Sequence, residues 1–422
     1  MSGRQAVELT LPIQAEFLPV ATACVEQTAQ AYGMGRVETM HLMLAVEEVL
    51  SFLAARLSGG HHLLKLHCRN GRYYMEVVCR FPSNVLPVGA FNITSTVSAD
   101  DEQSLAEMGL LLAARTADHL AVSAKNDDME IRFVKNRQYP ALPTIPASVA
   151  MQGSLRIAEP APELIKQFAA RVAGKYERQA PAYFQSPGKV ADMVASGDYG
   201  VSLVTDGKNN IMAGIFWRNG KQMAEAAGPY VFCAEADAAV QAVEGCLQKL
   251  ARTSVLCLVV QQPTPDMPAG YFEPLAQDGS VLYRQLAEDN GTLVYAHPIF
   301  ADYLTDGYRN LFLPRDIRRV ENQGEKQSLH SAFAVRMDRP AGRVVMESIW
   351  AGEDALAVVG QHIQALRQEG FREICFHLDT GVPEQALLSP ALSVNGFKPA
   401  WIVPWGGEGD ILVLAHREEE SC

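Results

Sequence analysis

Residues 40–53 read MHLMLAVEEVLSFL, with one histidine and two adjacent carboxylates among apolar residues. Imidazole and carboxylate groups are the side chains that most often transfer protons in catalysis. Residues three or four positions apart share a helix face, so a helix here would place His41, Leu44, Glu48 and Phe52 in one stripe. The alternative interpretation is that Glu47 and Glu48 belong to a solvated helix face.

Composition sets the class of protein in which such a helix could work. Of the 422 residues, 48% are hydrophobic and 20% are charged, which is typical of a globular protein. The net charge of −12 disfavours sequence-independent binding to nucleic acid or to an anionic membrane, because both partners attract basic surfaces. We find no apolar run long enough for a transmembrane helix and no apolar signal-peptide core, and we expect a cytoplasmic protein.

The eight cysteines are scattered and form no C-x-x-C pair. Most lie in apolar segments, where a free cysteine behaves as a small hydrophobic residue. We therefore expect no metal site.

The chain is long enough for about two to four domains. Residues 138–150 contain three prolines at a spacing of three, which predicts a stiff linker. The predicted units are residues 1–137, 151–298 and 299–422, with the last boundary inside the stretch 297–302, where a strand-like run gives way to a helical pattern.

The first unit has the pattern of a sheet with helices on one face. An Asn70-Gly71 pair between two strand-like runs predicts a tight hairpin. The expected strands and helices are, in order, 6–11, helix 15–32, helix 37–57, 63–68, 73–79, helix 104–118, 119–123 and 129–134.

The second and third units follow one common plan, in which strands lead into a long helix and then another strand. The repeat is clearest where Asp237 and Asp354 begin the two long helices, and both residues are predicted to be helix N-caps. The expected second unit has helices 162–175, 187–196 and 236–251 with strands 201–205, 211–217, 222–228 and 255–261. The expected third unit has helices 354–369 and 383–394 with strands 332–337, 343–350, 373–378, 397–403 and 411–416.

The first unit resembles the anti-sigma-factor serine kinases, which have the GHKL ATP-binding fold. The resemblance rests on LAVEEVL at residues 44–50 and on GLLLAARTADHL at residues 109–120. It implies that Glu48 is the general base, that Gly109 belongs to the ATP lid, and that an Asn four residues after Glu48 holds magnesium. In this chain that position is Phe52, which has no oxygen to ligate a metal. Arg80 stands near the sequence position where the family has its adenine-binding Asp, and the lid region keeps only one glycine. Phosphoryl transfer is therefore not expected.

The second and third units resemble tandem GNAT acyltransferase domains, in element order and in Asn395-Gly396-Phe397 at a helix-to-strand junction. The resemblance implies an acetyl-CoA pyrophosphate on backbone amides at the start of each long helix. Gly352 makes the third unit the better candidate, with Gly352 and Asp354 at the cofactor position, although carboxylates there would repel a phosphate. Tyr271 is the candidate catalytic acid, with Tyr283 as an alternative and core packing as the competing role for both.

Two functions are consistent with these patterns. The first is a regulatory protein that binds a sigma factor or a STAS-type antagonist through the first unit, with the tandem module sensing a small molecule or docking a partner. The second is an acyl-CoA-dependent N-acetyltransferase of the GNAT type controlled by the first unit. The implied cofactors are ATP and acetyl-CoA. A homodimer is the expected assembly, because kinase-like relatives are commonly dimeric.

Overall fold

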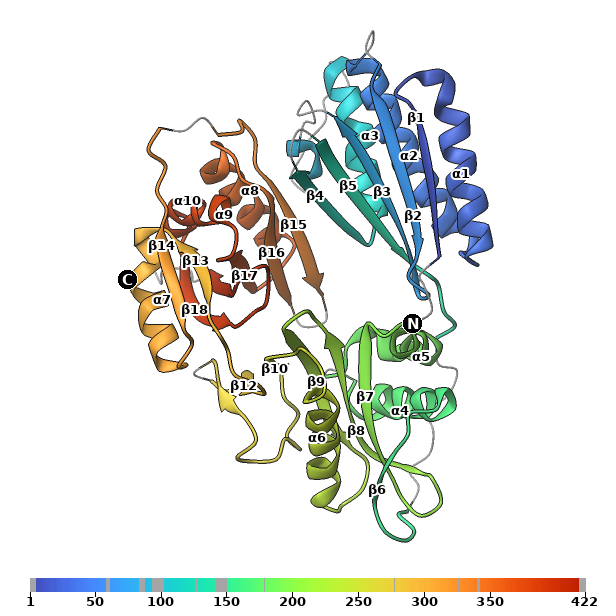
Figure 1. Ribbon diagram of the computed structural model, residues 1–422, viewed down its shortest axis with the longest axis vertical. Coiled ribbons are helices and arrows are strands. Elements are labelled where there is room, and N and C mark those ends of the chain that lie inside the picture. Colours follow the sequence, from blue (N-terminus) through green and yellow to red (C-terminus); the bar gives the residue numbers. More distant parts are fainter. Residues whose placement is uncertain are drawn as a thin grey trace.

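The computed structural model describes residues 5–57, 61–82, 88–92, 102–125, 128–141, 150–177, 179–276, 278–324, 327–339 and 342–416. It is a mixed α+β chain with separate sheets in its N-terminal, middle and C-terminal parts, which confirms the expected fold class. Figure 1 shows these three units arranged around a common junction. Within the described ranges, every helix is too short or too polar to cross a membrane.

The N-terminal unit is a five-stranded sheet in the order β1-β2-β3-β5-β4, and helices pack on one face of it (Figure 1). Leu42, Val46, Val49 and Leu53 point from α2 into the buried core, following the expected helical period. The strands are β1 (Ala6–Pro12), β2 (Leu63–Asn70), β3 (Tyr74–Pro82), β4 (His119–Lys125) and β5 (Asp128–Asn136). The helices are α1 (Leu18–Ala31), α2 (Arg36–Arg56), α3 (Glu102–Thr116) and the short η1 (Ala15–Phe17) and η2 (Val88–Phe91).

The predicted hairpin is present, but the prediction of a tight turn at Asn70-Gly71 is wrong. Asn70 still pairs with Met75, and the positive φ, +72°, belongs to Arg72. The Asn70 side chain instead accepts a hydrogen bond from the Arg72 amide at 2.9 Å, a local contact that stabilises the longer turn.

The middle unit has a seven-stranded sheet in the order β11-β12-β10-β9-β8-β7-β6. Its neighbours pair antiparallel except β9 and β10, which are parallel and are joined by α6 as a crossover helix. The strands are β6 (Arg156–Ala158), β7 (Tyr199–Thr205), β8 (Ile211–Asn219), β9 (Met223–Val231), β10 (Cys257–Gln261), β11 (Glu273–Pro274) and β12 (Val281–Gln285). The helices are α4 (Pro162–Lys175), η3 (Ala182–Gln185), α5 (Pro187–Ala195) and α6 (Asp237–Leu250).

The C-terminal unit repeats this plan in a five-stranded sheet, β15-β16-β17-β19-β18, with α8 crossing between the parallel strands β16 and β17. The helix expected at 383–394 is divided into α9 (Pro383–Ala386) and α10 (Ser389–Val394), since Pro390 has no backbone N–H to continue the helical hydrogen bonds. The other elements are β15 (Ala332–Asp338), β16 (Arg343–Trp350), α8 (Ala355–Gln368), β17 (Glu373–Asp379), β18 (Phe397–Val403) and β19 (Ile411–His416).

A strand–helix–strand segment precedes this sheet. β13 (Thr292–Ala296) pairs in parallel with β14 (Arg315–Arg319), and α7 (Pro298–Asn310) connects them. Val294 and Ala296 are buried in the same cluster as Phe333 and Phe376, so β13 packs with the C-terminal core. β14 is not predicted from the sequence, because its RDIRR letters lack an apolar alternation.

Each unit contacts both of the others. Tyr73 from the β2–β3 turn packs edge-on against Tyr199 of the middle unit, with ring centroids 6.2 Å apart. Ala332 of β15 is buried in the N-terminal core, and Val403 and Val413 share a cluster with Met223 of the middle unit. Apolar contacts therefore pack each unit against the other two.

Candidate functional site

The residues assigned to ATP chemistry lie where α2 and α3 meet. Phe52 is 3% exposed and is packed into the N-terminal core. Glu48 is partly buried, and burial followed by the charge of Glu47 raises the pKa of its carboxyl group. A Cβ on Gly109 would collide with the Glu48 carboxylate, so Gly109 is required for this close approach. The structure thus brings Glu48 and Gly109 together, while Phe52 supplies only apolar packing.

The turn that leads into α8 holds the residues assigned to acetyl-CoA, and two amides of this turn have partners within the chain. The Gly352 amide donates to the Ser331 hydroxyl at 3.0 Å, and the Glu353 amide donates to the Ser328 carbonyl at 2.8 Å. Asp354 occupies the N-cap position, but its carboxylate does not cap the helix. It accepts a hydrogen bond from the Ser331 amide at 2.6 Å instead. The 328–331 segment therefore occupies the place that the resemblance assigns to a pyrophosphate.

The same segment is attached to the N-terminal unit through Asn92. The Asn92 amide nitrogen donates to the Ser331 carbonyl at 2.8 Å, and its carbonyl oxygen accepts from the Phe333 amide at 2.8 Å. Both Asn92 and Ser331 are buried. No sequence pattern indicates this contact, because its partners are 239 positions apart.

In the middle unit, the N-cap prediction for Asp237 is wrong, because Ala236 takes that position and Asp237 is the first helical residue. Tyr271 donates a hydrogen bond to Glu244 of α6 at 2.8 Å, and this bond is the main cause of the raised pKa of the Tyr271 hydroxyl. The guanidinium of Arg284 lies over the Tyr271 ring. Tyr271 is therefore held at the surface of α6, in a different unit from Glu48 and from Gly352.

The parallel strands β9 and β10 of the middle unit separate beyond Ala226, so the later residues of β9 pair with β8 but have no partner on β10. The Val231 amide donates to the Tyr176 hydroxyl at 2.8 Å, and that oxygen lies 2.7 Å from Asp266 Oδ2. Burial is the main cause of the raised pKa of Tyr176. A side chain of the protein thus satisfies the polar groups that the strand separation exposes.

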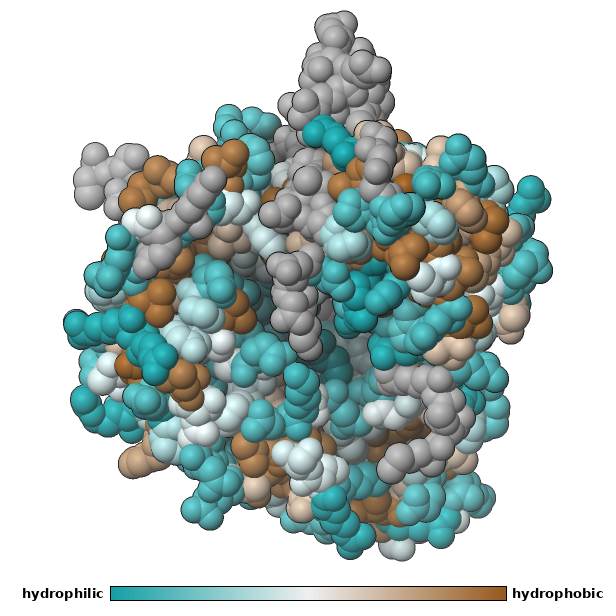
Figure 2. All heavy atoms as spheres, turned by 45° about the horizontal axis from the view of Figure 1, so that its top comes forward, coloured by the Kyte–Doolittle hydropathy of each residue, from teal (hydrophilic) through white to brown (hydrophobic). Residues whose placement is uncertain are grey.

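Charged side chains gather where the three units meet. Glu347 of β16 and His377 of β17 are direct register partners, with Nδ1 and Oε1 3.4 Å apart, and Arg336 lies 2.6 Å from the same oxygen. Burial alone would raise the pKa of the Glu347 carboxyl group. The hydrogen bond from His377 and the charge of Arg336 outweigh burial, so the pKa is lowered. Burial and then the Arg336 charge lower the pKa of His119 from the N-terminal unit. This cluster combines acidic, basic and imidazole groups. The face of the molecule drawn in Figure 2 has a hollow near its middle with hydrophilic residues around it.

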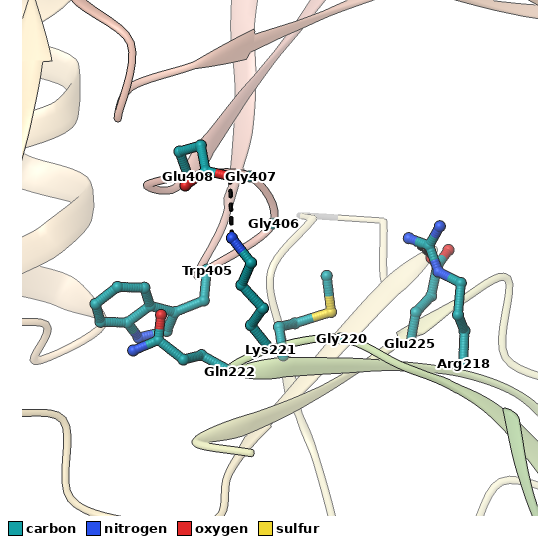
Figure 3. A pocket seen from close by; sticks show the side chains of 10 residues that line it. Arg218, Gly220, Lys221, Gln222, Glu225, Trp405, Gly406, Gly407 and Glu408 are labelled. Carbon is teal, nitrogen blue, oxygen red and sulfur yellow. Dashed lines mark hydrogen bonds and ion pairs between the residues drawn. The ribbon is translucent and has the colours of Figure 1, made fainter. Parts of the chain in front are cut away.

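A pocket of about 160 Å³ adjoins this cluster, between the β8–β9 turn of the middle unit and the loop after β18 (Figure 3). Arg218, Lys221 and Glu225 line it from the middle unit, and Trp405 and Glu408 line it from the C-terminal unit. Sequence reasoning missed this pocket and the charged cluster, since their members come from strands and turns far apart in the chain.

The fold and these sites define a three-unit α+β protein whose units meet at buried hydrogen bonds and at a polar pocket. No family model and no curated protein matches the chain. A solved structure described as "The crystal structure of SiaB-SiaC complex from Pseudomonas aeruginosa" is similar over 31% of this chain and 88% of that chain, with 17% sequence identity and a TM-score of 0.25.

Proposed function

We propose that the chain is a regulatory protein whose GHKL-type N-terminal unit binds a protein partner and does not transfer phosphate. The observation that carries the proposal is the position of Phe52, which is 3% exposed in the core where the kinase resemblance requires a magnesium-ligating Asn. An apolar ring cannot replace an oxygen ligand of magnesium. The proposed partner of the N-terminal unit, residues 1–137, is a sigma factor or a STAS-type antagonist. Residues 151–298 and 299–422 follow the linker 138–150 as the proposed tandem GNAT-like module, and β13 from the end of the first repeat packs with the core of the second.

The experiment uses the full chain with a purified STAS-domain protein and a purified sigma factor from the same organism. Calorimetry measures binding of Mg-ATP and of each protein separately, and labelled ATP reports phosphate transfer. We expect partner binding without phosphate transfer. Labelled phosphate on the STAS-domain protein would show that Glu48 works without the Asn ligand and would overturn the proposal. Absence of binding to both STAS-domain proteins and sigma factors would reject the proposed partner class.

A second candidate function, a GNAT-type N-acetyltransferase using acetyl-CoA, is favoured by the Glu347–His377 pair. A carboxylate beside an imidazole can orient it to accept a proton from an amine. The amides of Gly352 and Glu353, just before α8, already have partners in the 328–331 segment, which opposes this alternative. Calorimetry with acetyl-CoA and an amine-acetylation assay distinguish the two functions. The enzyme is favoured if acetyl-CoA binds saturably and an amine is acetylated. Glu347→Gln should then leave acetyl-CoA binding intact and abolish acetylation.

A further inference from the structure

The pocket between the middle and C-terminal units has one wall that is fixed by the carboxylates of Asp379 and Asp410. Asp379 accepts hydrogen bonds from the amides of Glu408 and Gly409, at 2.8 and 3.0 Å. Asp410, which is fully buried, accepts from the Trp405 amide at 2.8 Å. A Cβ on Gly407 would collide with Asp379, so the loop can follow this path only with glycine there. The wall is therefore a built feature of the fold.

Trp405 is prevented from moving into the pocket by contacts on its other side. Its indole nitrogen donates to Asp289 at 2.9 Å, and the Arg315 guanidinium stacks 4.7 Å from the ring centroid. Arg315 is itself fully buried and pairs with both Asp289 and Asp410. The Trp405 side chain therefore cannot relax to fill the space.

The pocket presents two cations and two carboxylates to the same small volume. Arg218 pairs with Glu225 at 3.1 Å on the middle-unit side, and Lys221 reaches across to Glu408 of the C-terminal unit at 3.1 Å (Figure 3). The Lys221 and Glu408 side chains are 82% and 71% exposed. Exposed ion pairs contribute little to stability, so a ligand with matching charges can replace them.

The size of the pocket restricts what can enter. Its volume of about 160 Å³ is below the range of about 300–1,000 Å³ that suits drug-sized ligands. Coenzyme A and nucleotides are excluded on this ground. An anion alone would face Glu225 and Glu408, and a cation alone would face Arg218 and Lys221, so each would meet uncompensated charge.

We propose that this pocket binds a small zwitterion of free amino-acid size, with its carboxylate at Arg218 and Lys221 and its ammonium group at Glu225 and Glu408. The proposal deepens the regulatory function proposed above by naming a small molecule for the tandem module. Since the ligand touches both repeats, its binding stabilises their present arrangement. Arg218 also contributes to the lowered pKa of Glu347 and of His119, so a ligand that draws Arg218 away would alter the charged cluster shared by the three units.

Isothermal calorimetry of the full chain with L-alanine, L-serine and L-aspartate tests the proposal, with propionate and propylamine as probes that carry one charge each. We expect saturable millimolar binding of at least one amino acid and weaker binding of both single-charge probes. Lys221→Ala and Glu408→Gln should each weaken binding by about tenfold, the effect of losing one charge-assisted contact. Lys166→Ala, which removes an exposed ion pair with Glu163 in α4, is the matched control and should bind as the native chain does.

The proposal is overturned if none of these amino acids binds at millimolar concentration, if propionate or propylamine binds as tightly, or if Lys221→Ala and Glu408→Gln both keep the native affinity. Melting temperatures of the variants establish that each is folded. Failure here is distinguishable from failure of the proposed function, since a chain that binds no amino acid can still bind a STAS-domain protein.

Discussion

The side-chain amide of Asn92 donates to the carbonyl of Ser331 at 2.8 Å and so joins the N-terminal unit to the C-terminal unit. Its oxygen accepts from the Phe333 amide, so one buried side chain satisfies two backbone groups at the entrance to β15. Ser331 in turn holds Gly352 and Asp354 at the start of α8. Any movement of the N-terminal unit away from β15 must therefore break buried hydrogen bonds next to the long helix of the last repeat.

Asn92→Ala should lower the free energy of unfolding by about 2 kcal/mol or more, because a buried backbone group left without a partner costs about 1–3 kcal/mol. Urea unfolding followed by tryptophan fluorescence is the measurement, since Trp350 packs against the N-terminal core at this interface. Asn322→Ala, which removes an exposed hydrogen bond from the Gly324 amide, is the control and should change stability by less than about 1 kcal/mol. Equal effects of the two substitutions would show that the interface contributes nothing.

Phe52→Asn should destabilise the N-terminal unit and fail to create Mg-ATP binding. Removing a buried phenyl ring costs about 3–5 kcal/mol, and the new amide would lie in an apolar core. Thermal unfolding and Mg-ATP calorimetry measure the two effects. Phe52→Leu is the control and should cost less than the Asn variant because it stays apolar. A stable Phe52→Asn variant that binds Mg-ATP would mean that position 52 faces a nucleotide site.

Local patterns predict most elements of this fold and few of its contacts between units. The helix containing Leu42, Val46 and Val49 follows from its period, and the helix ending at Gly370 follows from the positive φ of +87° that glycine tolerates. Strand β14 is not predicted, because most of its residues are charged and show no alternation of apolar and polar side chains. The Asn92–Ser331 contact and the Arg218–Glu347 neighbourhood depend on how separate units pack, and no local period encodes that packing.

Arg315→Ala should be strongly destabilising, because it leaves the carboxylates of Asp289 and Asp410 buried without their cation. Breaking a buried ion pair by removing one partner costs about 3–5 kcal/mol. Arg309→Ala, which removes an exposed pair with Asp306, should cost less than about 1 kcal/mol and is the matched control. Urea unfolding measures both, and similar costs would show that Asp289 and Asp410 find other partners when Arg315 is removed.

The stability of the chain should fall as the pH drops from about 7 to about 5, and His362 should contribute to that fall. The ring is fully buried, its Nδ1 donates to the Val358 carbonyl at 2.8 Å, and burial lowers its pKa below 6.5. Below pH 6.5 the unfolded chain takes up a proton that the folded chain resists, so stability is complete above that pH and is lost as the pH falls toward the folded pKa.

His362→Met replaces the imidazole with an apolar side chain of similar length that cannot be protonated. The stability of the variant should therefore depend less on pH in this window. The difference in unfolding free energy between the native chain and the variant should shift in favour of the variant as the pH falls. Gln361→Met, on the exposed face of the same helix, is the control and should show a difference that is independent of pH.

Residual pH dependence in His362→Met is expected from His119, whose pKa is also lowered. Carboxylates with lowered pKa values, such as Glu347, act at more acidic pH, because their stabilising charge is lost only below about 4.5. An unchanged pH profile in His362→Met would show that the buried imidazole becomes protonated without cost.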